Sequence, residues 1–240
     1  MTLLTDATAV FAAQTTGRCA VVFLSSLHAR VSPGVEQEAW TGIAATLDAL
    51  TYEGWTLSTR AMVHADAEGG PVAYATGFAH DIDLAGVFEA PSAAAALSGI
   101  VRLEETGWER LASTEWLVGV REFAAVSGHG VMERNWGFLA LWEWNDAWCA
   151  ASIAQRQAYD EACDEAFAAD VAAGVDIAGR HRLDWASRWH HLGVWEVHDP
   201  MTVDAAMRHH EQVADFKFTT SRHYLGRRGP LRELLSARHE

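Results

Sequence analysis

Two adjacent histidines, His209 and His210, are the residues of this 240-residue chain that most directly suggest chemistry. Their segment carries apolar residues at helical spacing. His210 falls on the same face as these residues, so its side chain is predicted to point inward. His209 lies about 100° around the helix, so both rings cannot face one ion. The apolar face consists of Val203, Ala206, Met207, His210, Val213 and Ala214.

An inward-facing imidazole at His210 has two interpretations. Burying the ring without a partner is costly, so it can be a core residue bonded to a carbonyl or a carboxylate. It can also bind a metal or haem iron, because a neutral imidazole nitrogen is a strong iron ligand. We favour His210 as the ligand and keep His209 as the alternative, and we expect Met207 on the same face to contact the cofactor.

A second set of polar side chains lies on a predicted strand, residues 188–197. Alternation along a strand places Trp189, His191 and Trp195 on one face, and we expect both tryptophans to contact the cofactor. An arginine or histidine near a bound substrate can polarise an oxygen or transfer a proton. The candidates for these catalytic roles are Arg188, His190 and His191 on this strand and His223 on the predicted final strand, residues 219–226.

Two strand carboxylates, Glu143 and Glu196, lie near tryptophans in the sequence. An inward-facing carboxylate has a raised pKa and can act as a base. A partner such as Arg182 or Arg188 would make it structural instead. The eleven tryptophans allow either a bulky core or an aromatic-walled cavity.

The elements that position these residues occur twice. Gly86-Val87-Phe88-Glu89 matches Gly193-Val194-Trp195-Glu196, and each is followed by a helix that begins near Pro91 or Pro200 and by a second apolar strand. These strands end at Gly119 and Gly226, so the two copies share the same spacing. At the position of His210 the first copy has Leu103.

The upstream elements repeat as well. Residues 20–28 and 137–144 are predicted strands. The first precedes a helix from Pro33 that ends at Gly54, and the second precedes a helix from Asp146 to about Ala173. Residues 55–64 and 177–184 are predicted as the next strands. Each half is then βαββαβ, with units at residues 1–126 and 127–240, the second ending in a basic tail with a short helix at 231–237.

Composition excludes several classes of protein. The formal charge of −14 disfavours nucleic-acid binding, and no apolar run approaches the length of a membrane helix. Three cysteines without CxxC spacing argue against a disulfide framework or a thiolate zinc site, and Cys163 is predicted as a small core residue. Residues 1–14 do not resemble a secretory signal, so a cytoplasmic location is expected.

This order of elements resembles the dimeric α+β barrel superfamily, with two ferredoxin-like units fused in one chain. The resemblance covers about residues 20–226 and implies an α+β fold with antiparallel sheets closed into a barrel. It also implies that a homodimer can form. Within the superfamily, the chain looks like the haem-containing aldoxime dehydratases and chlorite dismutase-like proteins.

In aldoxime dehydratases the iron ligand is a histidine on a helix shortly before the final strand, which is where His210 stands. The chain departs from that family in its shorter length and in lacking a His-Pro-Thr-His-like stretch. The resemblance therefore implies a haem-dependent lyase or oxidoreductase acting on a small hydrophobic or aromatic substrate. The alternatives are a cofactor-free monooxygenase or isomerase and a non-catalytic binder of a hydrophobic ligand.

Overall fold

Eight antiparallel strands form a closed barrel in the order β1-β3-β2-β8-β5-β7-β6-β4. The computed structural model describes residues 16–64, 67, 70–130, 133–213 and 215–236. The first four strands come from the first half of the chain and the other four from the second half. Their bounds are β1 Cys19–Leu27, β2 Val72–Ala75, β3 Leu84–Ala90, β4 Ala112–Arg121, β5 Trp136–Trp144, β6 Asp176–Arg182, β7 His191–Val197 and β8 Thr219–Pro230.

The two halves of the barrel use the same strand order. In the first half β1 lies between β3 and β4, and in the second half β5 lies between β7 and β8. The repeated Gly-Val-aromatic-Glu segments are the centres of β3 and β7. The halves meet where β2 pairs with β8 and β4 pairs with β6. The predicted α+β barrel of two ferredoxin-like units with antiparallel sheets is confirmed.

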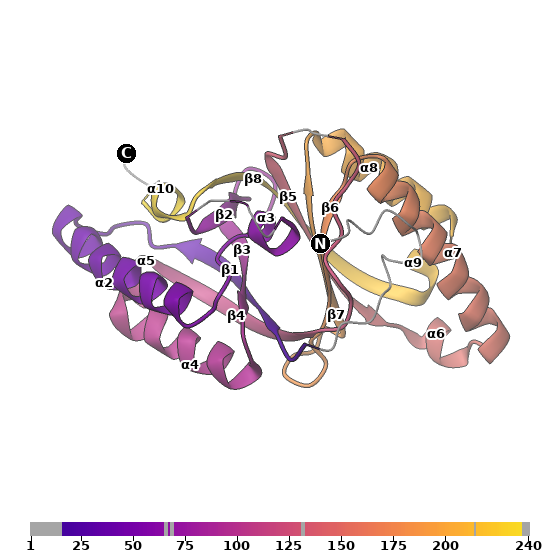
Figure 1. Cartoon of the computed structure of the whole chain (residues 1–240), viewed down its shortest axis with the longest axis horizontal. Helices are drawn as coiled ribbons and strands as arrows, with labels where there is room; N and C mark the ends of the chain where they lie inside the picture. The colour runs from indigo at the N-terminus through magenta and orange to yellow at the C-terminus, as the bar shows by residue number, and fades with distance from the viewer. Residues whose placement is uncertain (1–15, 65–66, 68–69, 131–132, 214, 237–240) are drawn as a thin grey trace.

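Each half of the barrel is covered on its outer face by its own helices, which form two layers on opposite sides (Figure 1). Helices α2 (Pro33–Tyr52) and α4 (Ala93–Leu103) cover the first half, with η1 (Glu104–Trp108) and α5 (Glu109–Leu111) after α4. Helices α6 (Asp146–Ala150), α7 (Ile153–Ala172), α8 (Pro200–Gln212) and α9 (Asp215–Phe218) cover the second half. One apolar cluster lies under each helical layer, and a third fills the barrel.

Local sequence explains why α7 and α8 begin where they do. The Ser152 hydroxyl accepts a hydrogen bond from the Gln155 amide, and the Gln155 side chain accepts one from the Ser152 amide, which forms a capping box. Asp199 caps α8 and Pro200 occupies its first turn. The buried side chains of α8 are Val203, Ala206 and His210, as the apolar spacing predicts.

The strand predicted at residues 55–64 is wrong. Helix α3 (Thr59–Val63) occupies this segment, because the Ser58 hydroxyl accepts a hydrogen bond from the Ala61 amide and starts a helical turn. The corresponding strand is β2, which is short. Helix α3 contacts β6 and β7 of the other half, so this segment links the two halves.

Two further boundaries differ from the predictions. The single helix expected from Asp146 is divided, because Ala151 adopts an extended conformation between α6 and α7. Strand β8 continues through Pro230, and α10 (Leu231–Leu235) packs into the core of the first half. The basic tail therefore docks within the same chain. Residues 1–14 and 237–240, which figured in the predictions, lie outside the described residues.

None of the helices among the described residues is long and apolar enough to cross a membrane.

Candidate metal centre

A pocket lies between the outer face of the second half-sheet and helices α7, α8 and α9. Its free space is ≈ 80 Å³. Six aromatic side chains line it, and its polar groups come from both the helices and the sheet. It is lined by Ala140, Trp142, Trp144, Tyr159, Asp160, Cys163, Asp164, Phe167, Arg180, Gly193, Trp195, Met207, His210, Asp215, Phe216, Thr219, Ser221 and His223.

His210 projects from α8 into this pocket and is only 1% exposed. Its Nε2 lies 2.9 Å from Oδ2 of Asp170, a buried carboxylate on α7. Its Nδ1 has no hydrogen-bond partner among the described residues, although it lies 3.3 Å from Oδ2 of Asp215. One ring nitrogen is thus fixed, and the other faces the pocket at ion-pair distance from a second carboxylate.

The pKa of His210 reflects these neighbours. Burial by itself lowers the pKa, but contacts with Asp170, Asp215 and Cys163 outweigh it and raise the pKa to about 11. Without a metal, the ring is therefore an imidazolium held between two carboxylates.

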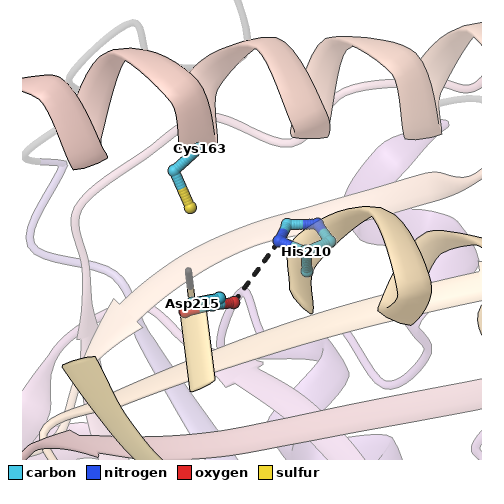
Figure 2. Close-up of side chains that lie close together, drawn as sticks. All are labelled: Cys163, His210 and Asp215. Atoms are coloured by element: carbon cyan, nitrogen blue, oxygen red, sulfur yellow. Dashed lines mark ion pairs between the residues drawn. The ribbon is translucent and has the colours of Figure 1, made fainter. Parts of the chain in front are cut away.

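Cys163, His210 and Asp215 converge from three helices, α7, α8 and α9 (Figure 2). One potential ligand atom of each lies within 4.8 Å of the others. Tyr159, one turn before Cys163 on α7, has its hydroxyl 2.6 Å from Oδ1 of Asp215 and 3.6 Å from the Cys163 sulfur. Burial raises the pKa of Tyr159, so the phenol stays protonated and donates to Asp215.

Arg180 brings a positive charge to the sheet side of the pocket. Its Nε lies 3.1 Å from Glu122, and its guanidinium lies over the Phe123 ring. Burial lowers the pKa of Arg180, although the group remains a cation at neutral pH. Burial also raises the pKa values of Asp160 and Asp164, which face Arg180 from α7.

Four of the predicted site residues line the pocket: Trp195, Met207, His210 and His223. The periodicity correctly predicts that Trp195 lies on the pocket side of β7 and that Met207 and His210 lie on the inward side of α8. Burial lowers the pKa of His223, whose ring contacts Phe138 and Phe216. These four residues lie together in the lining of the pocket, and their roles stay predictions.

Three predicted residues lie elsewhere. Trp189 packs inside the barrel, Arg188 is exposed with its guanidinium over the Trp189 ring, and His190 accepts a hydrogen bond from the Trp144 amide through Nδ1. The reason is that β7 begins only at His191, so strand alternation does not extend to residues 188–190. None of the three is among the pocket-lining residues.

His191 lies beside the pocket rather than in its lining, stacked on Trp142 with ring centroids 5.2 Å apart. Glu196 points into the barrel, where it accepts a hydrogen bond from Tyr74 and pairs with Arg228. Glu196 is therefore structural, with Arg228 as its partner in place of the predicted arginines. Glu143 does not line the pocket.

Several residues of the site escaped the sequence reasoning. The sequence predicts Cys163 as a core residue and indicates no role for Asp170, Asp215 or Arg180. A signal does exist on α7, where Tyr159, Cys163 and Phe167 recur every four residues and so share one face. Nothing in the sequence shows that this face lies opposite His210.

Comparison with known proteins supports the fold alone. No protein-family model and no curated protein matches the sequence. A double mutant of chlorite dismutase from Candidatus Nitrospira defluvii superposes with a TM-score of 0.74 at 12% identity, over 95% of this chain and 98% of that one. The chlorite dismutase of the same organism in complex with imidazole superposes with a TM-score of 0.73 at 13% identity, over 93% of this chain and 96% of that one. The fold expected from the element order is confirmed, and the chain has the chlorite dismutase-like α+β barrel fold.

Proposed function

We propose that the pocket of the second half is the active site of a metal-dependent enzyme that acts on a small organic substrate. The observation that carries this proposal is the state of His210. One ring nitrogen is bonded to a buried carboxylate, and the other faces the pocket at 3.3 Å from Oδ2 of Asp215, without hydrogen-bond geometry. A carboxylate behind a histidine is the usual arrangement for a metal ligand, because it fixes the ring and raises its basicity.

Haem is the metal group that the resemblance to chlorite dismutase-like proteins implies. A porphyrin bound to Nδ1 of His210 would need open space beyond that atom, where Asp215 Oδ2 lies at 3.3 Å. The pocket offers ≈ 80 Å³, whereas sites for drug-sized ligands occupy about 300–1,000 Å³. The donor atom suits a metal, but the side chains around it do not fit a porphyrin in this arrangement.

The other lining residues support a small aromatic or apolar substrate that carries an oxygen. Trp142, Trp144 and Trp195 offer flat apolar walls. Arg180 can donate hydrogen bonds to an oxygen that carries negative charge. His223, whose pKa is lowered by burial, is neutral near pH 7 and can accept a proton.

A metal ion held at His210 would polarise a substrate oxygen or lower the pKa of a bound water. His210 is buried, and electrostatic interactions are stronger at a buried position than in bulk water.

Metal retention tests the proposed function. The full-length protein is exposed to haemin, and separately to zinc and ferrous ions, and is then dialysed. At least one metal group should remain bound to the wild type and to His209→Ala but not to His210→Ala. Equal retention in all three proteins would contradict the proposal. Oxygen consumption by metal-free protein with quinol-like substrates would favour a cofactor-free oxygenase instead.

A further inference from the structure

We propose that Cys163, His210 and Asp215 form a mononuclear site for a zinc-class divalent ion, with one coordination position open to the aromatic pocket. This inference rests on the proposed metal-dependent function and specifies its metal as a protein-bound ion in place of haem. Catalytic zinc is commonly held by three protein ligands, with water or substrate in the fourth position.

The separation of the ligand atoms matches such an ion. Oxygen and nitrogen ligands lie about 2.0–2.1 Å from zinc, so in a tetrahedral site two of them are about 3.3–3.4 Å apart. Nδ1 of His210 and Oδ2 of Asp215 are 3.3 Å apart and lack hydrogen-bond geometry. The Cys163 sulfur lies within 4.8 Å of one ring nitrogen of His210 and of one carboxylate oxygen of Asp215.

Two of the three ligands are already oriented by a second residue. Asp170 holds the Nε2 side of His210 at 2.9 Å, which leaves Nδ1 directed at the site. The Tyr159 hydroxyl holds Oδ1 of Asp215 at 2.6 Å, which leaves Oδ2 directed at His210. Such outer partners fix the orientation of metal ligands and tune their basicity.

The charge and softness of the ligands select the class of ion. A cysteine thiolate, an aspartate and a neutral histidine together carry two negative charges, which balance a divalent cation. Thiolate and imidazole favour zinc over magnesium or calcium. Asp160 and Asp164 also line the pocket, and their carboxyls favour a cation there over a porphyrin with its two carboxylates.

The tryptophans and Arg180 line the same pocket as the three proposed ligands. A substrate oxygen could reach the ion while its apolar body lies against the aromatic walls. The class of ligand that fits is therefore a small aromatic or apolar compound with a carbonyl or hydroxyl oxygen.

Cobalt substitution tests this site without an activity assay. The full-length protein is stripped with a chelator and titrated with Co²⁺. Because a thiolate ligand gives a charge-transfer band in the near ultraviolet, the wild type should develop this band with one ion per chain. Cys163→Ser should lose the band but keep the visible bands of bound cobalt. Cys149→Ser changes an exposed cysteine outside the cluster and should behave as the wild type.

The positioning residues give a graded result. Asp170→Asn should weaken cobalt binding about 10- to 100-fold, as loss of an outer partner usually does. His210→Ala should abolish binding, whereas His209→Ala should bind normally. Circular dichroism of each variant shows whether it is folded. If His210→Ala does not fold, the loss of the charge-transfer band in Cys163→Ser still decides the question.

The outcomes separate this inference from the proposed function. A Soret band after haemin reconstitution that disappears in His210→Ala, with no thiolate–cobalt band, would overturn the zinc-class site and leave a metal-dependent enzyme. A cobalt spectrum that is unchanged in Cys163→Ser would also overturn it. If neither haem nor a divalent ion binds through His210, both proposals fall.

Discussion

The buried histidines of this protein differ because their neighbours differ. His210 lies between two carboxylates, which raise its pKa, whereas His191 stacks on Trp142 and lies 3.7 Å from a carboxylate oxygen of Glu122. Burial, followed by the charges of Arg180, His190 and Arg182, lowers the pKa of His191 to about 3. The folded protein therefore holds this ring neutral.

The low pKa of His191 predicts a loss of stability in acid. The unfolded chain binds a proton at His191 below about pH 6.5, but the folded protein does so only below about pH 3. Between these values the unfolded state binds more protons, so the free energy of unfolding falls as the pH falls. The contribution is up to about 1.4 kcal/mol per pH unit. Urea unfolding from pH 7 to pH 4 measures this slope.

The variant His191→Phe isolates this contribution. Phenylalanine keeps a ring against Trp142 and cannot bind a proton, so the dependence of stability on pH should become shallower. His28→Phe, at an exposed position, should keep the wild-type slope. An unchanged slope in His191→Phe would show that protonation of His191 does not contribute to the dependence of stability on pH.

At the scale of single elements, periodicity predicted the face of a helix but not its partner. The stripe on α8 was sufficient to place His210 inward. The other two proposed ligands come from α7 and α9, so no short motif contains all three. Residues 55–64 were misread because their apolar content suits a strand, while the decisive signal was the cap at Ser58. The hydrogen bond to the Ser58 hydroxyl stabilises a helical turn, and the strand preference of this segment is weak, so the segment forms a helix.

Helix α7 carries Cys163 and Asp170, and its N-terminal cap predicts a measurable effect. Ser152→Ala removes the hydroxyl that accepts the Gln155 amide hydrogen bond and should lower the free energy of unfolding by about 0.5–2 kcal/mol. Ser32→Ala is a matched control, because Ser32 precedes α2 and makes no side-chain cap hydrogen bond. Chemical denaturation compares the two variants. Equal losses would mean that the cap on α7 contributes nothing specific.

At the scale of the whole molecule, the repeat made the architecture predictable. Matching Gly-Val-aromatic-Glu segments and equal spacing to Gly119 and Gly226 were enough to infer two units of the same strand order. The spacing did not reveal how the units join. That junction depends on the pairing of β2 with β8 and of β4 with β6, which are contacts between residues distant in sequence.

The C-terminal helix also connects the halves. Strand β8 belongs to the second half, yet α10 places Leu231 in the first core, where it is fully buried. Leu231→Ala should destabilise the protein by about 2–5 kcal/mol. Leu97→Ala, at a site that is 51% exposed on α4, should cost little.

Because the barrel is continuous, we expect a single unfolding transition in both leucine variants. Urea denaturation followed by tryptophan fluorescence and by circular dichroism would report it. Two separate transitions in Leu231→Ala would indicate that the halves unfold independently.

The most direct test of a metal centre at His210 is to load the protein with zinc, dialyse it and measure the zinc that remains by mass spectrometry. The wild type, His209→Ala and His210→Ala are compared. We expect one zinc ion per chain in the first two proteins and none in the third. Zinc that stays bound in His210→Ala, or that is absent from the folded wild-type protein after loading, would contradict a zinc-class site at His210.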